Sequence, residues 1–232
     1  MYNNRNVFAV ILARGGSKDV PRKNVLMIAG KPLIAHSIDV AKKTKYIDEV
    51  FVSTEDREIK QISTNYGAIV IDRPSNLATD DAKFLDALKH LINSIPQIKN
   101  QNPIIVMLFA PAPIRKISDI EKCIEMLDEN VDCVVSLSEV KKHPYRMLVK
   151  KNDGYLDFYE KEQIISTRQK TQPLYVNGSI CVTSSNFLKK QKFLVYGGRI
   201  KGLLMDEKHS MDIDTKLDFE ICKYIMESDN DI

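Results

Sequence analysis

Residues 7–24 read VFAVILARGGSKDVPRKN. The apolar run 7–13 lacks the polar alternation of a half-exposed strand, so it predicts a buried parallel strand. Gly15 and Gly16 follow, and glycines at the carboxyl end of a strand let backbone N–H groups approach a bound anion. Against one acid, Asp19, this loop carries four cations: Arg14, Lys18, Arg22 and Lys23. A triphosphate suits such a loop, but glycine and charge alone predict an ordinary strand–helix turn with solvated lysines about equally well.

The loop differs from the two common phosphate-binding motifs. A Walker A loop requires G-x-x-x-x-G-K-[ST], and residues 15–18 have neither the spacing of the second glycine nor a Ser or Thr after the lysine. The segment does not fit G-x-G-x-x-G either. We therefore expect loop amides and several separate cations to hold the phosphates.

Strand-like and helical segments alternate along the chain. Apolar residues recur at helical spacing in segments 33–41, 59–66, 84–95 and 117–127, and Ser118 or Asp119 is expected to cap the last of these. Further strands are expected at 49–53, 68–71, 104–109 and 131–137. Repeated β-then-α units predict an α/β fold with a Rossmann-like, mainly parallel sheet, helices on both faces and ligands at the carboxyl ends of the strands. Because there is no linker and no internal repeat, we expect residues 1–232 to form one domain.

Composition excludes several classes of function. The 232 residues carry a formal net charge of +3 with acids between the lysines, which argues against nucleic-acid and membrane binding. No run of about 20 apolar residues is present, and the polar start lacks a signal-peptide core, so we expect a cytoplasmic protein. Four cysteines lack metal-ligand spacing and are expected to be reduced core residues: Cys123, Cys133, Cys181 and Cys222.

Two later segments stand out. Helical periodicity disappears over 143–174, where Tyr155, Phe158 and Tyr159 lie among charged residues and short strand-like pieces are expected. In the second segment, Asp212 and Asp214 flank Ile213, so an extended backbone would place both carboxylates on one side and Ile213 in the core.

The aspartate pair has two interpretations. Paired carboxylates suit Mg²⁺, which takes carboxylate and phosphate oxygens. Alternatively, Asp214 is the N-cap of a last helix and Asp212 a solvated loop residue, and residue type alone favours this second interpretation. That helix is expected to bury a stripe of Leu217, Ile221 and Ile225.

The loop motif resembles that of a known family. Residues 12–24 follow L-A-R-G-G-S-K-x-x-P-x-K-N, which is similar to the nucleotide-binding signature of the acylneuraminate cytidylyltransferases. These are the CMP-sialic acid synthetases and their bacterial relatives for legionaminic and pseudaminic acids. Further similar motifs follow in the family's order, at 30–33, 52–54, 73–80, 112–115, 177–180 and 211–215. Several motifs in order are far more specific than one.

The resemblance implies a nucleotide-diphospho-sugar transferase fold and a Mg²⁺-dependent nucleotidyltransferase. Such an enzyme transfers CMP from CTP to the anomeric hydroxyl of a nonulosonic acid, releasing pyrophosphate and giving an activated sugar for surface glycans. The resemblance also implies catalytic roles for Arg14, Lys23, Asp212 and Asp214, with the two aspartates as metal ligands. The implied nucleotide-binding residues are Ala13, Arg14, Gly15, Ser17, Lys18, Lys23, Asn24, Arg73 and Thr79.

The family also implies how the sugar is bound. Residues 143–174 would be a β-rich insertion exchanged across a homodimer, completing the sugar site of the partner subunit. The alternative is a surface arm of the same monomer. The implied sugar-binding residues are Phe109, Arg115, Arg146, Arg168 and Asn177.

Departures from the family pattern bear on the substrate. Phe109 stands where the sialic acid enzymes commonly have an amide, and Cys181 stands where a tyrosine is expected. Both changes remove polar groups, which favours a less hydroxylated sugar such as a deoxy-diamino nonulosonic acid. Glu55 replaces the usual aspartate after the second strand and is expected to move a carboxylate outward.

Two alternatives stay open. One is a CMP-3-deoxy-octulosonate synthetase type of enzyme, although that family usually begins its loop A-R-x-x-S-x-R-L-P-G-K. The other is a nucleotide-binding relative without catalysis, against which the joint presence of Arg14, Lys23, Asp212 and Asp214 argues.

Overall fold

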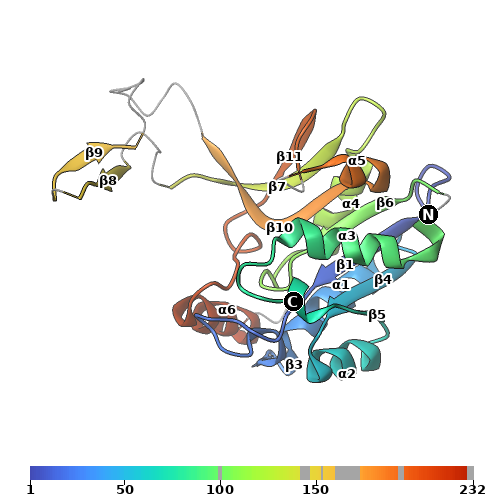
Figure 1. The fold of residues 1–232 in the computed structure, drawn as a ribbon, viewed down its shortest axis with the longest axis horizontal. Helices are drawn as coiled ribbons and strands as arrows, with labels where there is room; N and C mark the ends of the chain where they lie inside the picture. The colour runs from blue at the N-terminus through green and yellow to red at the C-terminus, as the bar shows by residue number, and fades with distance from the viewer. Residues whose placement is uncertain (99–100, 142–146, 153, 160–172, 193–195, 229–232) are drawn as a thin grey trace.

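A seven-stranded sheet forms the centre of the molecule, in the strand order β11-β7-β10-β6-β1-β4-β5 (Figure 1). The computed structural model describes residues 1–98, 101–141, 147–152, 154–159, 173–192 and 196–228. The strands are β1 (Val7–Leu12), β4 (Glu49–Thr54), β5 (Ile69–Asp72), β6 (Ile104–Leu108), β7 (Cys133–Glu139), β10 (Leu174–Ser184) and β11 (Ile200–Leu204). All pairings are parallel except those of β10 with β6 and β7. The predicted mainly parallel sheet is confirmed.

Strand β1 shows why the apolar run lacks alternation. Val7, Ala9 and Ile11 pack in one core with the helices α1 (Leu33–Lys43), α2 (Arg57–Asn65) and α4 (Ile117–Glu125). Phe8 and Val10 face a second core formed with α3 (Phe84–Ser94) and α5 (Ser185–Lys190). Because both faces of the strand are covered, every second residue has no solvent to face. Helices therefore cover both faces of the sheet, as predicted.

The prediction for the start of α4 is wrong in detail. The helix begins at Ile117, and Asp119 acts from within its first turn by accepting the backbone N–H of Lys116 at 3.2 Å. Ser118 has no capping contact of this kind. By contrast, α2 begins with a side-chain cap, since the Asp56 carboxylate accepts the N–H groups of Glu58 and Ile59.

The sequence interpretation missed two strands of the central sheet, β10 and β11. Strand β10 returns antiparallel between β6 and β7, and its register shifts between Val176 and Cys181. Gly178 lies in this irregularity with a φ of 65°, a conformation that glycine adopts without steric cost. Residues 180–183, Ile-Cys-Val-Thr, carry the β-branched signal that would have identified the strand.

A third apolar cluster joins the loop after β1 to the C-terminal part of the chain. Val20, Ile28 and Ile213 pack there against Cys222 and Met226 of α6 (Lys216–Ser228). The small strands β2 (Met27–Ile28) and β3 (Lys31–Pro32) and the 3-10 turn η1 (Lys23–Val25) connect the loop to α1. Two more 3-10 turns are η2 (Ser75–Leu77) and η3 (Pro96–Ile98).

The predicted apolar stripe of α6 is wrong for two of its three residues. Leu217 is 68% exposed and Ile221 is 38% exposed, whereas Ile225 packs at the edge of the core. The helix meets the core through Cys222 and Met226, so its buried face lies one position further along than the leucine–isoleucine pattern indicated. The four cysteines are buried and free, as predicted.

Strands β8 (Leu148–Lys150) and β9 (Leu156–Phe158) pair antiparallel in a hairpin that lies away from the sheet (Figure 1). The hairpin exposes large apolar side chains, including Tyr155, Leu156 and Tyr159. The other parts of the predicted insertion, 143–146, 153 and 160–172, lie outside the described residues. None of the described helices is long and apolar enough to cross a membrane.

Candidate active site

The loop after β1 is anchored by hydrogen bonds to the neighbouring strand β4 and its end. Ala13 N–H donates to the carbonyl of Ser53 at 3.0 Å, and Gly15 N–H donates to the Glu55 carboxylate at 2.7 Å. A Cβ on Gly15 would lie 2.5 Å from the Asp56 carboxylate, so glycine permits this close approach. Neither glycine of the pair has a positive φ; the left-handed residue of the loop is Arg22, with φ 59°.

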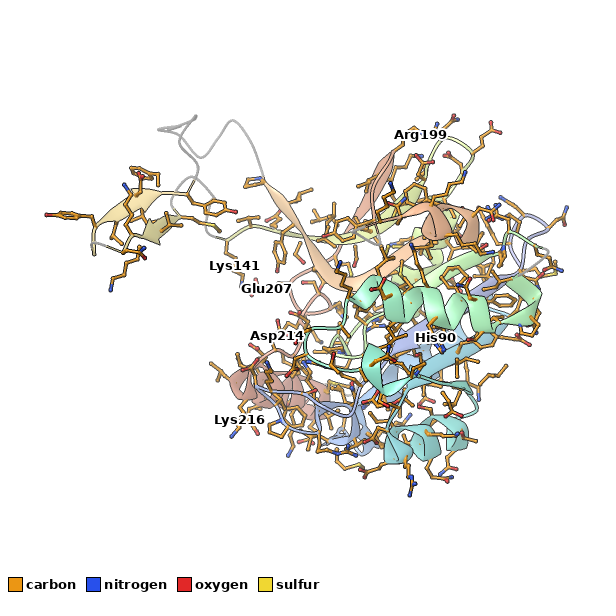
Figure 2. The ribbon with its side chains drawn as sticks, in the orientation of Figure 1. His90, Lys141, Arg199, Glu207, Asp214 and Lys216 are labelled. Atoms are coloured by element: carbon orange, nitrogen blue, oxygen red, sulfur yellow. The ribbon has the colours of Figure 1, made fainter. Side chains whose placement is uncertain are left out.

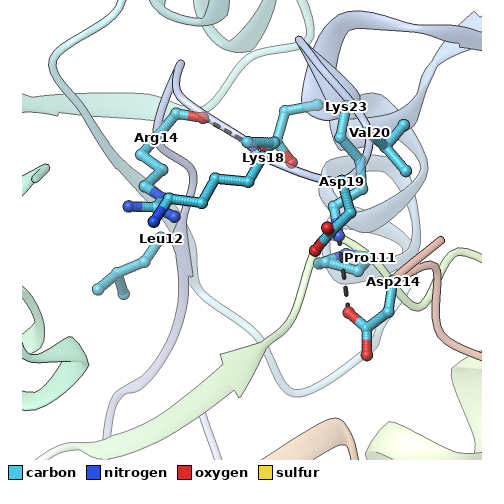
Figure 3. A pocket seen from close by; sticks show the side chains of 10 residues that line it. Leu12, Arg14, Lys18, Asp19, Val20, Lys23, Pro111 and Asp214 are labelled. Atoms are coloured by element: carbon cyan, nitrogen blue, oxygen red, sulfur yellow. Dashed lines mark hydrogen bonds and ion pairs between the residues drawn. The ribbon is translucent and has the colours of Figure 1, made fainter. Parts of the chain in front are cut away.

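A cavity of about 340 Å³ opens beside this loop, which we call the phosphate-side cavity (Figure 3). Its lining residues are Leu12, Arg14, Ser17, Lys18, Asp19, Val20, Lys23, Asn24, Pro111 and Asp214. The structure thus brings the cationic loop together with the aspartate segment from the other end of the chain. Figure 2 shows Asp214 on the loop that leads into α6.

Lys23 makes this connection. Its ammonium group donates to the carbonyl of Ile213 and lies 3.8 Å from the Asp214 carboxylate, the ion pair drawn in Figure 3. The Lys23 side chain is 13% exposed, while that of Asp214 is 76% exposed. Asn24 connects two parts of the loop, since its side-chain amide donates to the carbonyl of Arg14 at 3.0 Å.

Asp212 and Asp214 lie as the i, i+2 spacing predicts. Ile213 between them is fully buried and its N–H donates to the carbonyl of Pro111 at 2.9 Å, while both aspartates are exposed. Partial desolvation by the surrounding chain raises the pKa of Asp212, and the like charge of Asp214 raises it further. Two hard oxygen donors that repel one another fit a divalent cation. Within the described residues no group of three or more His, Cys, Asp or Glu forms a complete metal site.

The alternative role of Asp214 as an N-cap is wrong. Thr215 caps α6, because its hydroxyl accepts the N–H of Asp218 at 3.2 Å. The Asp218 carboxylate in turn accepts the N–H groups of Thr215 at 2.7 Å and Asp214 at 3.1 Å. Because the side chains of Thr215 and Asp218 each accept the backbone N–H of the other, the two residues form a capping box. It leaves the carboxylate of Asp214 free of any capping role.

A second cavity of about 270 Å³, the base-side cavity, shares Leu12 and Arg14 with the first. Arg73 lines it, is 7% exposed, and donates to the hydroxyl and carbonyl oxygens of Ser53 at 3.1 and 2.6 Å. Burial lowers the pKa of Arg73. Thr79 also lines this cavity, and its carbonyl accepts from Arg14 at 3.1 Å. The two cavities therefore form one cleft with Arg14 between them.

Acidic side chains from other elements form ion pairs with the cations of the loop, and the sequence interpretation missed these pairs. Asp80 lies 2.9 Å from Arg14 and 3.0 Å from Lys18, which lower the pKa of its carboxyl. Arg22 pairs instead with Asp56 and Glu58 and does not line the cleft. Asp80 is the last residue of the motif at 73–80 that the sequence analysis identified, so its position in that motif was the available signal.

Glu55 also points toward the loop, through its bond to Gly15. The expectation that this longer side chain moves its carboxylate outward is wrong.

The three described sugar-binding candidates lie near one another but line neither cavity. Arg115 donates to the carbonyl of Phe109, and Phe109 and Asn177 both form hydrogen bonds with the backbone of Ser179. The Phe109 ring stacks on Phe84, with ring centroids 5.4 Å apart and planes at 15°. Asn177 is 4% exposed, and its amide bonds Ser136, Ser138, the Ser179 N–H and the Met205 sulfur. Arg115 is 4% exposed and lines neither cavity. Arg146 and Arg168 lie outside the described residues. Sugar contacts by these five residues stay predictions.

Known proteins resemble this chain over most of its length. N-acylneuraminate cytidylyltransferase of Streptococcus agalactiae is 35% identical over 216 residues, which cover 90% of this chain and 51% of the relative. The chain thus spans about half the length of these streptococcal relatives. CMP-N,N′-diacetyllegionaminic acid synthase of Legionella pneumophila is 32% identical and is covered over 96% of its length. Post-translational flagellin modification protein B of Campylobacter coli is also 32% identical, with 96% covered.

A solved structure shows the same fold. CMP:2-keto-3-deoxy-manno-octonic acid synthetase complexed with CTP superposes with a TM-score of 0.73 over 96% of this chain, at 18% identity. This likeness concerns the fold of the sheet and its helices. Residues 8–223 match the sequence family described as cytidylyltransferase. The cleft, the fold and this match agree, and the chain belongs to the cytidylyltransferase family.

Proposed function

We propose that this chain transfers CMP from CTP to the anomeric hydroxyl of a nonulosonic acid. The hydroxyl oxygen forms a bond to the α-phosphorus, the bond from that phosphorus to the β-phosphate oxygen breaks, and pyrophosphate leaves. The hydroxyl proton passes to solvent. The observation that carries this proposal is the convergence at Lys23, where the cationic loop meets the Asp212–Asp214 segment beside one cavity.

The residues of the cleft support a division of roles. Arg14, Lys18 and Lys23 would neutralise triphosphate charge, which is the main requirement in transferring a phosphoryl group. Asn24, Arg73 and Thr79 would hold the ribose and the base, with Ala13, Gly15 and Ser17 supplying backbone and hydroxyl contacts along the loop. Arg73 suits this role because Ser53 fixes its guanidinium and leaves donor capacity facing the base-side cavity.

Mg²⁺ is part of the proposal. Asp212 and Asp214 would hold it, since they present two adjacent carboxylates whose mutual repulsion a dication relieves. When bound, the ion supplies positive charge beside the phosphates. Lys23 keeps the loop and the aspartate segment together, so that a phosphate held by the loop would lie beside Asp214, which lines the phosphate-side cavity as Asp212 does not.

The substrate proposal rests on the relatives and on Phe109. The relatives covered over nearly their whole length are named for legionaminic acid synthesis and flagellin modification. Phe109 provides no side-chain hydroxyl or amide, which favours a deoxy-diamino nonulosonic acid over a more hydroxylated one. Cys181 gives no such support, because it is buried in the core beside Cys133 and lines neither cavity. The sugar carboxylate calls for an arginine or a lysine, for which Arg146 and Arg168 are the predicted candidates.

We further propose a homodimer, in which the hairpin β8–β9 packs on the partner subunit. The exposed apolar side chains of this hairpin support it, since they lie away from the core of their own chain (Figure 1). Sedimentation velocity would test it, with a dimer expected at micromolar concentration and a persistent monomer refuting it. The need for CTP fits a cytoplasmic enzyme.

Pyrophosphate release tests the reaction. We expect release from CTP and Mg²⁺ with a legionaminic-type acid, at least tenfold faster than with N-acetylneuraminic acid. Pseudaminic and 3-deoxy-octulosonic acids complete the panel. Faster release with N-acetylneuraminic acid would refute the substrate proposal. No release with any acid, from protein that CTP still stabilises thermally, would refute the reaction and indicate a nucleotide-binding relative.

A further inference from the structure

A third cavity lies outside the cleft, between α1 and α4, and we call it the α1–α4 pocket. Its volume is about 500 Å³. The chain segment 111–115 separates it from the cleft, because Pro111 lines the phosphate-side cavity while Pro113, Ile114 and Arg115 line the α1–α4 pocket. No residue of this pocket lines either cavity of the cleft.

The pocket is strongly cationic. Lys31 and Lys43 reach it from β3 and α1, and Arg115 and Lys116 reach it from the segment before α4. Asp39 is the single acid in the lining and is already paired with Lys31. His36 and His209 also line the pocket.

Arg115 lacks a carboxylate partner among the described residues. One terminal nitrogen donates to the carbonyls of Phe109 and Ala112, whereas Nε and Nη1 are buried and have no acceptor in the described part of the chain. A buried cation whose N–H groups are unpaired is costly, and an anion nearby offsets that cost. Burial lowers the pKa of Arg115 to about 9.

The start of α4 adds a second source of positive potential. Lys116, Ile117 and Ser118 all line the pocket, and α4 is nine residues long. The first N–H groups of a helix lack partners within the helix and favour a negatively charged ligand. Here the Asp119 carboxylate takes up one of the N–H groups at this end, that of Lys116, at 3.2 Å. Three lysines, an arginine without a carboxylate partner among the described residues and a helix start therefore surround one space. Two of the lysines also have exposed ion pairs, Lys31 with Asp39 and Lys116 with Asp206 at 3.9 Å, and Asp206 bonds the His209 ring at 2.6 Å.

The volume and the apolar lining of the pocket indicate that an organic group could be attached to the anion. Val40, Ile114, Ile117 and Met226 form apolar walls of the pocket. A cavity of this size is typical of small-molecule sites and leaves room beyond a single oxyanion. From the cations, the helix start and these walls, we propose that the α1–α4 pocket binds a phosphate group, carried by a small organic phosphomonoester or free as inorganic phosphate.

This site is separate from the proposed reaction, yet one hydrogen bond connects the two. Pro111, in the segment between them, accepts the N–H of Ile213, which separates the two aspartates. A ligand that orders segment 111–115 would therefore also order the position of Ile213.

Histidine ring signals in a ¹³C-resolved NMR spectrum test the proposal directly. The chain has four histidines, and His→Gln variants assign their signals. Inorganic phosphate and phenyl phosphate are titrated into the full-length protein. We expect saturable shifts of His36 and His209 and none of His90, which lies on α3 on the opposite face of the sheet (Figure 2). Tighter binding of phenyl phosphate identifies a phosphomonoester site, and equal affinity identifies a site for the free ion.

Paired variants separate this pocket from the cleft. The double variant Lys43→Ala/Lys116→Ala removes two exposed lysines and is expected to weaken phosphate binding about tenfold or more. Lys122→Ala/Lys190→Ala removes two exposed lysines elsewhere and should leave the affinity unchanged. Lys18→Ala removes a cation of the cleft and should leave the His36 and His209 shifts in place. Shifts lost only in Lys18→Ala, or absent at tens of millimolar phosphate in folded protein, would overturn the proposal.

Discussion

Replacing Asp212 by asparagine is expected to raise stability and abolish most turnover. The folded chain holds the Asp212 proton to a higher pH than the unfolded chain, whose carboxyl titrates near 3.8. Stability therefore falls as pH rises from 3.8 through the raised pKa, and the full cost is present at neutral pH. Because the side chain is exposed, solvent screens the repulsion from Asp214, and the expected gain is about 0.5 kcal/mol.

That gain corresponds to a melting temperature higher by about 1–2 °C for a chain of this size. The difference in melting temperature should vanish near pH 3, where residue 212 is uncharged in both proteins. Turnover is expected to fall about 10²- to 10³-fold, the loss typical of removing one preorganised electrostatic group from an active site. Added Mg²⁺ should raise the melting temperature of the unaltered protein more than that of the variant.

Thermal melts at pH 7 and pH 3, with and without Mg²⁺, and pyrophosphate release measure these effects on the same preparations. A variant that is less stable than the parent at pH 7 would refute the argument from repulsion. A variant that turns over within about threefold of the parent would remove Asp212 from the metal site, since carboxylate charge is the property tested.

Asp218→Asn is the matched control in the same segment. Although partial burial opposes it, the hydrogen bonds from Thr215 and Asp214 lower the pKa of Asp218. Its charged form therefore stabilises the fold above the ordinary carboxyl pKa, and this contribution is lost as pH falls through the lowered value. The variant should lose about 1 kcal/mol through the weakened cap of α6 and keep its turnover.

Two further predictions concern the cationic loop. Asp80→Asn should tighten CTP binding about threefold in calorimetry, because a triphosphate no longer competes with this carboxylate for Arg14 and Lys18; weaker binding would show that Asp80 positions them instead. Gly15→Ala should cost about 1–3 kcal/mol in urea unfolding, since its Cβ would meet the Asp56 carboxylate, and an unchanged midpoint would show that the loop moves freely.

Periodicity predicted the sheet and its covering helices because parallel strands buried on both faces leave an apolar run that is easily distinguished. It missed β10, whose antiparallel return between β6 and β7 is fixed by pairing partners far away in sequence. It also assigned the wrong residues to the buried face of α6. That face is set by the contact of Cys222 and Met226 with Ile213 and Val20, which local hydrophobicity does not encode.

In the candidate site, too, the sequence did not reveal contacts between distant residues, here the ion pairs of the loop. Along the sequence the loop has one acid for four cations, yet the fold supplies a carboxylate to each cation. Arg14 and Lys18 share Asp80, Lys23 faces Asp214, and Arg22 joins the start of α2. These pairs differ in their surroundings. The Asp80 side chain is 48% exposed, so water can solvate it once a ligand takes its partners.

The Arg22 pair has a different status, because Asp56 also caps α2 through two backbone N–H groups. Releasing Arg22 would leave that cap in place but break a bidentate ion pair, so this cation fixes the loop to the start of α2. In the proposed function, Arg14 and Lys18 would exchange an internal carboxylate for a phosphate, while Lys23 would keep its bond to the carbonyl of Ile213. The loop thus combines one cation fixed in an ion pair outside the cleft, Arg22, with three that line the cleft, and in the proposed function only these three would meet the triphosphate.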